Sequence, residues 1–480
     1  MVLDQNKSYL RFFEEICAIP HGSGNEKQLS DFLMEFARSR GLWAWQDEWW
    51  NVIIKKPAAP GCEKAAPVLL QGHMDMVCEK RTDSTHDFLC DGLNLAVEDG
   101  WVHAQGTTLG ADDGYAVATM LALLEDETLK APALECVFTT QEETTMAGAA
   151  GLDYSLLTAR RMIGLDEAGE TQTCVSTAGS MSVKAVLPLT WEEDDRAHVR
   201  FTVRGLCGGH SGLMIDKGRG NAVCLAARLF TRILGQDSRV RLTGITGGAA
   251  ENAIPHECTV GFTCDETFVP HAEQILRELA RNIAWELRQT DPGFCLDVAQ
   301  VQGRGKSLTE TATRAVADML RLFPNGVAAM SFAVPGLVQT SVNLGKVDLD
   351  EEGLILYCLL RSVTDSQMDE LFERIAGLFR MCGAKHTVGK RFPGREMLLV
   401  SPLREALRVL MREQWGEELV ELAAHGGGEG GYFSSRLPGL DIITLGPLME
   451  GVHSPEEKMS LASFDKVYHL LRLLLERLTD

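Results

Sequence analysis

A histidine and an aspartate separated by one residue stand at the end of an uncharged apolar segment. Val68-Leu69-Leu70-Gln71 has the composition of a buried strand, and Gly72-His73-Met74-Asp75 follows it. Side chains two residues apart in a strand project to the same side, so His73 and Asp75 can act at one point beyond the strand. A ring nitrogen of His73 can bind a metal ion while the Asp75 carboxylate orients the ring. By itself such a pair is more often structural.

Acidic residues and a second histidine follow other apolar segments in a comparable way. Apolar strands are predicted over 134–140 and 162–165, and an apolar helix over 115–124. The two aspartates before the helix could simply cap it, although the glycines on both sides of the pair indicate a tight bend. In open α/β sheets ligands bind at the carboxyl ends of the strands, where these side chains would meet. The collected candidates are His73, Asp112, Glu142 or Glu143, Asp166 and His453.

This set of side chains predicts a pair of metal ions. Two histidines and three carboxylates suit two Zn²⁺ ions, each taking one imidazole and one terminal carboxylate while a third carboxylate bridges them. Mg²⁺ prefers oxygen ligands and water to imidazole. Two ions about 3.5–4 Å apart can hold a water molecule and lower its pKa. The glutamate left over from the 142–143 pair would then act as the general base.

The composition restricts the class of protein. A chain of 480 residues is too long for one ordinary core and suggests about two to four domains. The net charge of 46 − 67 = −21 argues against nucleic-acid binding. No apolar run approaches about eighteen residues, the N-terminus lacks a signal-peptide pattern, and the thirteen cysteines include no C-x-x-C pair. We therefore expect a cytoplasmic protein that does not enter a membrane.

The distribution of strand and helix patterns predicts a discontinuous first domain. Buried strands occur over 1–187 and again over 389–480, whereas strands and amphipathic helices alternate over 188–388. We expect a catalytic domain formed by the two outer segments, with the middle segment inserted as a lid and substrate-binding domain. The inserted segment holds about twice the elements of a sandwich of four strands and two helices. It is therefore expected to contain two ferredoxin-like modules in tandem.

The motifs resemble those of a known family, the co-catalytic di-zinc metallopeptidases that include carnosinases, carboxypeptidase G-type enzymes and acetylornithine deacylase. The matching segments are Gly72-His73-Met74-Asp75, Gly110-Ala111-Asp112-Asp113-Gly114, Gln141-Glu142-Glu143, Leu165-Asp166 and the late His453. Segments 19–26, 208–212 and 340–345 look most like the aminoacyl-histidine (Xaa-His) dipeptidase branch. The resemblance covers nearly the whole chain. It implies an α/β fold with a zinc-peptidase-like mixed sheet flanked by helices and an inserted α+β lid.

The resemblance also assigns the metal ligands. It implies that His73 and Asp166 bind one ion, that Glu143 and His453 bind the other, and that Asp112 bridges the two. The expected cofactors are two Zn²⁺ per chain, with Mn²⁺ or Co²⁺ as alternatives.

Further roles near the metals follow from the same resemblance. Asp75 would steady the His73 ring, and Glu142 would be the general base and acid. A cis peptide bond is expected between Asp112 and Asp113.

In the lid, the resemblance points to three residues that contact substrate. His210 would donate to the oxyanion that develops on the scissile carbonyl, and Asn252 and Arg361 would hold the C-terminal carboxylate of the substrate. Single-module relatives carry the arginine shortly after the motif that contains the asparagine, but here it lies in the second half of the lid. We therefore expect either a monomer with a pseudo-dimeric lid, which completes its own site, or a homodimer.

A glycine-rich loop near the C-terminus is expected to contact the other end of the substrate. Glu429 matches the residue that pairs with a free amino group. Gly428 and Gly430 depart from the family pattern, which has a larger apolar residue and a cysteine at these positions. The departure changes the shape expected for the pocket around the amine.

The sequence thus predicts a dipeptidase for small peptides with a free N-terminus, with Xaa-His and carnosine-like β-Ala-His peptides as candidate substrates. A metal-bridged water would attack the peptide carbonyl. A deacylase or an aminotripeptidase of the same architecture is the enzymatic alternative. A metal-binding scaffold without catalysis is the alternative of another class, although a scaffold has no need of the base Glu142.

Overall fold

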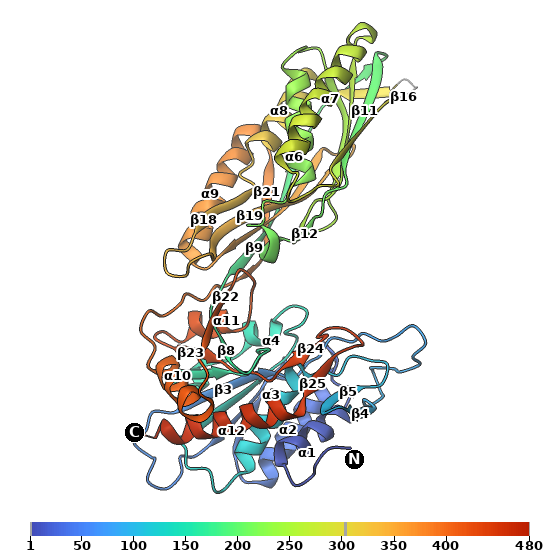
Figure 1. The fold of residues 1–480 in the computed structure, drawn as a ribbon. Coiled ribbons are helices and arrows are strands. Elements are labelled where there is room, and N and C mark those ends of the chain that lie inside the picture. The colour runs from blue at the N-terminus through green and yellow to red at the C-terminus, as the bar shows by residue number, and fades with distance from the viewer. Residues whose placement is uncertain (1, 302–304, 480) are drawn as a thin grey trace. The chain divides into compact units, whose positions relative to one another are not determined.

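Two compact units make up the part of the chain that the computed structural model describes, residues 2–301 and 305–479 (Figure 1). Unit 1 comprises the chain up to Ser176, Arg395–Ala423 and the chain from Gly428 on, and unit 2 comprises Thr177–Gly394 and Ala424–Gly427. Each unit has its own hydrophobic core. Within the described residues, no helix is long and apolar enough to cross a membrane.

A six-stranded mixed sheet forms the centre of unit 1. Its order is β1-β2-β6-β3-β7-β23; β6, β3, β7 and β23 run parallel, and β2 runs antiparallel to both of its neighbours. Helices cover both faces of parallel strands, which explains why β3 is buried along its whole length. The strands are β1 (Trp43–Gln46), β2 (Val52–Lys56), β3 (Val68–His73), β6 (Leu134–Thr139), β7 (Arg161–Gly164) and β23 (Asp441–Thr444).

The two faces of this sheet pack against different helices. Because side chains alternate along a strand, Val68 and Leu70 join the larger core and Leu69 joins the smaller one on the other face. Helices α1, α2, α3, α10 and α12 contribute to the larger core, whereas α11 contributes to the smaller. The helices of unit 1 are α1 (Ser8–Cys17), α2 (Lys27–Ser39), α3 (Ala111–Glu125), α4 (Ala147–Gly151), η1 (Tyr154–Leu156), α10 (Pro402–Trp415), α11 (Gly430–Arg436) and α12 (Leu461–Arg477).

Two smaller sheets complete unit 1. One has the order β24-β25-β5-β4, and the other pairs β22 with β8. Their strands are β4 (Leu95–Glu98), β5 (Trp101–Ala104), β8 (Gln172–Thr177), β22 (Val420–Ala424), β24 (Met449–Glu450) and β25 (Lys458–Ser460).

Unit 2 contains a nine-stranded antiparallel sheet whose core lies between the strands and four helices (Figure 1). The strand order is β16-β11-β15-β13-β19-β20-β9-β21, and β18 pairs with β19 beside this path. The strands are β9 (Gly179–Leu187), β11 (Ala197–Arg204), β13 (Arg241–Gly247), β15 (Cys258–Cys264), β16 (Cys295–Val301), β18 (Gly326–Met330), β19 (Val338–Leu349), β20 (Leu354–Ser362) and β21 (Lys385–Phe392). The helices are α6 (Ala222–Leu234), α7 (Val269–Glu286), α8 (Glu310–Leu322) and α9 (Asp365–Cys382).

This sheet consists of two modules of four strands and two helices, joined where β13 pairs with β19. The inner module uses β11, β13, β15 and β16 with α6 and α7, and the outer module uses β9, β19, β20 and β21 with α8 and α9. In both modules the first strand in sequence lies between the third and the fourth. The inner module is inserted into the outer one after β9, and this nested arrangement differs from the tandem arrangement expected from the sequence.

Short elements surround the insertion point and the loops of unit 2. A two-stranded ribbon of β10 and β17 pairs Trp191 with Leu308 and Asp194 with Gly305, so the chain enters and leaves the inner module side by side. A second ribbon pairs β12 with β14. These elements are β10 (Trp191–Asp194), β12 (Gly209–His210), α5 (Ser211–Met214), β14 (Ala253–Ile254), η2 (Glu266–Phe268) and β17 (Gly305–Leu308).

The boundaries of the units differ from the expected domain boundaries at 187/188 and 388/389. The division falls at 176/177 and 394/395, because β9 and β21 pair with each other and β9 pairs with β20 in the sheet of unit 2. The segment 424–427 also groups with unit 2 rather than with the flanking residues.

Candidate metal centre

Strand ends bring the predicted ligands together at one edge of the unit 1 sheet. His73 is the last residue of β3 and pairs in register with Thr139, the last residue of β6. Gln71 of β3 pairs with Gly164, the last residue of β7. The loops that leave β6 and β7 therefore begin beside His73, and they carry Glu142, Glu143 and Asp166. The other two ligand candidates are Asp112, at the start of α3, and His453, in the loop between β24 and β25.

Asp112 lies between the two histidines. Its Oδ1 is 3.1 Å from Nε2 of His73, and its Oδ2 is 3.3 Å from Nε2 of His453. His453 Nε2 is also 2.7 Å from Oε1 of Glu143. The peptide bond between Asp112 and Asp113 is cis, as the family resemblance implied. One carboxylate oxygen of Asp112 thus faces each of the two histidines.

Among the described residues, three groups of side chains offer ligand atoms within 4.8 Å of one another. One group is His73, Asp112 and Asp166, and another is Asp112, Glu143 and His453. These two share Asp112 and equal the two ligand sets that the resemblance assigned. A third group contains His73 with Glu142 and Glu143. Imidazole and carboxylate donors in this mixture suit Zn²⁺ and similar divalent ions.

The electrostatics of the cluster show a deficit of positive charge. Burial raises the pKa of Asp166 to about 7, and the neighbouring Asp112 carboxylate raises it further. Hydrogen bonds to Asp112 and Glu143 raise the pKa of the His453 imidazole to about 10. For His73 burial lowers the pKa, but hydrogen bonds with Asp112 and Asp75 outweigh burial and raise it well above its usual value. The raised pKa values mean that these side chains bind protons, which partly neutralise the negative charge of the cluster. A divalent cation would neutralise more of that charge.

Asp75 organises the surroundings of His73. Its backbone carbonyl accepts a hydrogen bond from Nδ1 of His73 at 3.0 Å, which leaves Nε2 facing Asp112. The Asp75 carboxylate accepts hydrogen bonds from the backbone N–H of Glu142 at 2.9 Å and of Glu143 at 3.2 Å. One buried residue thus fixes both the ring of a ligand, through its backbone carbonyl, and the loop that carries the two glutamates, through its carboxylate.

The N-terminal motif at 19–26 supports the same loop. Ser23 Oγ donates to the Asp75 carboxylate at 2.8 Å, and the backbone N–H of Gln141 donates to Oε1 of buried Glu26 at 3.1 Å. The sequence identified this motif only by resemblance, and the structure shows what it contacts.

Glu457 was not identified from the sequence. Its buried carboxylate accepts hydrogen bonds from the backbone N–H groups of Leu109 at 2.8 Å, Gly110 at 3.1 Å and Ala111 at 2.9 Å. It therefore ties the chain that precedes Asp112 to the loop that carries His453. The only signal in the sequence was a glutamate four residues after the candidate histidine.

Glu429 lies beside β3 and β6 with half of its carboxylate unsatisfied. Oε2 accepts hydrogen bonds from Gln71 Nε2 at 2.7 Å and Thr139 Oγ1 at 2.6 Å, whereas buried Oε1 has no hydrogen-bond partner among the described residues. Burial raises the pKa of Glu429 to about 8, although the hydrogen bond from Thr139 opposes the shift. An unsatisfied buried carboxylate oxygen is suited to accept a hydrogen bond from an ammonium group.

Unit 2 brings its three predicted substrate residues together. Nη2 of Arg361 lies 3.3 Å from Nε2 of His210, and His210 pairs across the β12/β14 ribbon with Ala253, the neighbour of Asn252. A guanidinium only donates, so Nε2 of His210 accepts and the neutral ring carries its proton on Nδ1. Burial and the charge of Arg361 lower the pKa of His210.

A second neutral histidine lies near Arg361. His425 is buried, and its Nε2 is 2.7 Å from Oγ of Ser341, the residue that pairs with Arg361 across β19 and β20. Burial lowers the pKa of His425 to about 4, and the charge of Arg361 lowers it further. Arg361 is itself 7% exposed, and its Nε has no partner in the described part of the chain. It therefore has donor capacity left for an anionic ligand.

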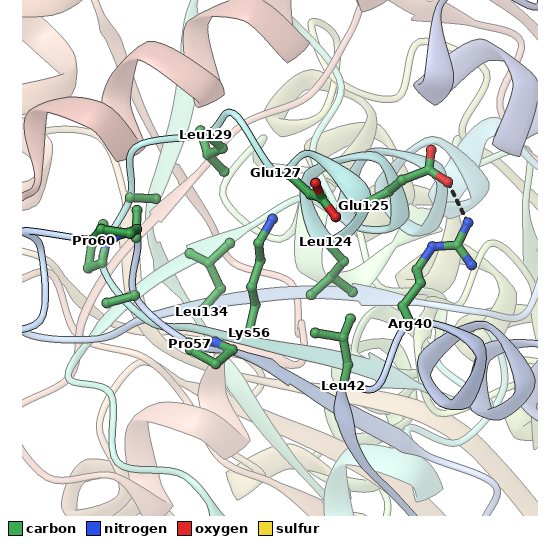
Figure 2. A pocket seen from close by; sticks show the side chains of 14 residues that line it. Arg40, Leu42, Lys56, Pro57, Pro60, Leu124, Glu125, Glu127, Leu129 and Leu134 are labelled. Atoms are coloured by element: carbon green, nitrogen blue, oxygen red, sulfur yellow. Dashed lines mark hydrogen bonds and ion pairs between the residues drawn. The ribbon is translucent and has the colours of Figure 1, made fainter.

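A pocket of unit 1 lies at the opposite end of the sheet. It measures about 390 Å³ and is bordered by Lys56 at the end of β2, Leu134 at the start of β6 and Leu124 near the end of α3 (Figure 2). Three of its charged side chains are already engaged: Arg40 pairs with Glu125, and Lys56 Nζ donates to the carbonyls of Leu123 and Asp126. This pocket is distant in the sheet from the ligand cluster and contributes nothing to it.

Imidazoles and carboxylates gathered at the carboxyl edge of a mixed α/β sheet define a metal-dependent hydrolase. Residues 69–477 match the model of Peptidase family M20/M25/M40, and the chain belongs to this family. The metallopeptidase family expected from the motifs is thereby confirmed, as are the α/β fold class and the hydrolase class.

Relatives of known sequence or structure match nearly the whole chain. It is 33% identical over 471 residues to the cytosol non-specific dipeptidase of Escherichia coli (strain K12), covering 97% of this chain and 96% of that protein. It is similar to the structure of aminoacylhistidine dipeptidase from Vibrio alginolyticus with a TM-score of 0.93 and 30% identity, covering 98% and 96% of the two chains. An aminopeptidase from Bacillus cereus shares the fold, with a TM-score of 0.58 and 15% identity over both whole chains.

Proposed function

We propose that the protein is a metal-dependent dipeptidase for peptides with a free N-terminus. The position of Asp112 between His73 and His453, with Glu143 and Asp166 completing two ligand groups, is the observation that carries the proposal. The names of both full-length relatives, a non-specific dipeptidase and an aminoacylhistidine dipeptidase, support the dipeptide substrate.

Two divalent cations would be held at the centre. His73 and Asp166 would hold one, Glu143 and His453 the other, and Asp112 would contact both. Such ions, when bound, polarise a peptide carbonyl and lower the pKa of water. The mixed imidazole and carboxylate set favours Zn²⁺, with Mn²⁺ or Co²⁺ as alternatives.

Glu142 would move the proton. Burial raises its pKa well above the usual value, and the Asp166 carboxylate raises it further, which favours a side chain that can both take up and release a proton. It would accept a proton from the attacking water and pass it to the leaving amine nitrogen. Asp75 would position both His73 and the backbone of Glu142 for this step.

The two ends of the substrate would be recognised by different residues. The unsatisfied Oε1 of Glu429 supports a contact with the free amino group. Arg361 and Asn252 would hold the C-terminal carboxylate, and Nδ1–H of His210 would donate to the developing oxyanion. We further propose that Xaa-His and β-Ala-His peptides are among the substrates.

A single chain would be sufficient for activity. His210 belongs to the inner module and Arg361 to the outer one, yet they contact each other in one chain. This supports a monomer with a pseudo-dimeric lid rather than an obligate homodimer. Activity per chain that stays constant on dilution, with a monomeric elution volume, would agree; loss of activity on dilution would contradict it.

The name of the Escherichia coli relative supports a cytosolic location.

The proposed function is tested by hydrolysis of β-Ala-His, Gly-His, Ala-Leu, Ala-Ala-Ala and N-acetyl-Ala with added Zn²⁺, Mn²⁺ or Co²⁺. Wild type is compared with Glu142→Ala and with Glu48→Gln, which changes an exposed glutamate. Unblocked dipeptides should be cleaved by wild type and Glu48→Gln but not by Glu142→Ala. Cleavage of N-acetyl-Ala alone would indicate a deacylase, and of Ala-Ala-Ala alone an aminotripeptidase. No cleavage by metal-loaded protein would indicate a scaffold.

A further inference from the structure

A small cavity in unit 1 lies next to two buried arginines. It measures about 30 Å³ and is bordered by Arg395, Arg404 and Ser434 and by apolar side chains of β8 and β23. Glu396 also borders it, but this residue is exposed. None of these residues has a part in the metal centre.

The two arginines differ in how their charges are compensated. Arg404 lies 3.3 Å from a carboxylate oxygen of Glu421 and donates to the carbonyl of Leu398 at 3.0 Å. Arg395 is 5% exposed and has no carboxylate at ion-pair distance among the described residues. Its Nη2 donates to the carbonyl of Cys174 at 2.9 Å, but its buried Nε has no hydrogen-bond partner in that part of the chain.

A buried guanidinium without a counter-ion is unfavourable, because neutral acceptors replace only part of the water that its charge has lost. Burial accordingly lowers the pKa of Arg395. A partner in the cavity would supply the missing acceptor and the missing negative charge. About 10–15 Å³ accommodates one water-sized occupant, so a cavity of about 30 Å³ has room for one small ion but not for a whole peptide.

We propose that the cavity beside Arg395 is a binding site for a small free anion, of which chloride is the physiological representative. Arg395, Arg404 and Ser434 border the cavity with polar side chains, and Val175, Leu440 and Ile442 border it with apolar ones. The ion would neutralise Arg395 as Glu421 neutralises Arg404.

The site is connected to the loop that carries Glu429. A Cβ atom added at Gly430 would lie 3.3 Å from Nε of Arg395, so the guanidinium packs directly against this glycine. Gly430 begins α11, and Ser434 of the same helix borders the cavity. Bound anion would therefore stabilise the conformation of α11 and of the preceding loop.

Binding is tested with full-length protein in two ways. Crystals of wild type soaked in bromide should give an anomalous peak in the cavity next to Arg395. In solution, replacing gluconate by chloride at constant ionic strength should raise the unfolding midpoint of wild type by about 2–4 °C in a saturable manner. Arg395→Met should lose this rise, while Arg160→Met, which changes an exposed arginine of the same unit, should keep it.

Three outcomes would overturn the proposal. One is the absence of a bromide peak in the cavity, which would leave water as the occupant. Another is an equal chloride response in wild type and Arg395→Met. The third is a bromide peak without any chloride-dependent rise, which would mark an adventitious ion only. If Arg395→Met does not fold, Arg395→Lys, which retains the charge but loses Nε, replaces it and should show a reduced rise.

A carboxylate of the substrate is the other possible source of negative charge. Values of kcat/KM for Glu-Ala and Gln-Ala, measured in wild type and Arg395→Met, distinguish a substrate carboxylate from a free anion as the partner of Arg395. The free-anion proposal predicts the same ratio in both proteins. An Arg395-dependent preference for Glu-Ala would overturn it in favour of an acidic substrate. This arm rests on the proposed function, and failure to cleave either peptide would count against that function, not against the anion site.

Discussion

Replacing Glu457 by Gln would test whether one buried carboxylate holds the chain that presents Asp112. The carboxylate is 2% exposed and accepts three backbone hydrogen bonds of 2.8–3.1 Å from Leu109, Gly110 and Ala111. Glutamine retains one acceptor oxygen but turns the other into an NH₂ group, which would face a backbone N–H. The substitution therefore removes one or two of the three bonds and adds a repulsive donor pair.

The magnitude follows from the number of bonds lost. A hydrogen bond to a charged group contributes about 1.5–3 kcal/mol, so Glu457→Gln should lower the free energy of unfolding of unit 1 by roughly 2–5 kcal/mol. At about 2–4 °C per kcal/mol, the unfolding midpoint should fall by on the order of 5–15 °C. Displacement of Asp112 should also weaken metal binding by about 10–100-fold, as expected when a group that positions a ligand is removed.

The assays are thermal unfolding of metal-free and metal-loaded protein and a titration of activity against Zn²⁺. Glu456→Gln is the matched control, because Glu456 is the adjacent residue, is exposed and pairs with Arg81 at 3.3 Å. The control should behave as wild type. If Glu457→Gln and Glu456→Gln unfold at the same temperature and require the same Zn²⁺ concentration, the reasoning is refuted.

Three further changes have defined outcomes. Glu142→Gln should lower kcat by about 10²–10⁴-fold, the usual contribution of a general base, with metal content unchanged in elemental analysis. Chelation should abolish activity and lower the unfolding midpoint, since crowded carboxylates lose their cations, and Zn²⁺ should restore both. Hydrogen bonds from Arg196, Thr263 and Ser307 outweigh burial and lower the pKa of Asp194, so its contribution to unit 2 is present above the unfolded pKa of about 4 and is lost on further acidification. Asp194→Asn should remove this acid-sensitive component from unfolding measured between pH 2 and pH 7.

For each of these three predictions, one result would contradict the reasoning. Loss of metal together with activity in Glu142→Gln would make this residue a ligand instead of a base. Full activity after exhaustive chelation would exclude metal-dependent hydrolysis. Identical acid unfolding of wild type and Asp194→Asn would show that other carboxylates govern the acid limit of unit 2.

The residues of the ligand cluster could be predicted from the sequence because each lies close in the chain to a short segment with a recognisable pattern. Short apolar runs identified β3, β6 and β7, and the polar residues directly after them are those that the sheet brings to one edge. The choice between Glu142 and Glu143 was not accessible from the residues alone. It depends on which side chain faces His453, and the structure gives this position to Glu143, at 2.7 Å.

The strand order of unit 2 could not be predicted from the sequence in the same way, because it depends on pairing between strands that are distant in the chain. The strand β9 follows the first part of unit 1 directly, and nothing in its own residues shows that it pairs with β20 and β21. The same strand accounts for the displaced boundary and for the nested modules. Glu457 illustrates the same limit, because the backbone groups of its three shortest hydrogen bonds lie 346–348 positions earlier in the chain.

The ribbon of β10 and β17 has a consequence for the order in which the chain folds. Ser307 Oγ donates to Asp194 at 2.8 Å, although 113 residues separate them. Closing so long a loop before any of it has folded costs more chain entropy than closing a short one. If the inner module folds first, its compact body brings the two ribbon strands together, and the outer module then has only a short gap to close between β9 and α8. In this order of folding, each module forms its strand pairs between segments that are already close, although the two ends of the nested insertion are far apart in the sequence.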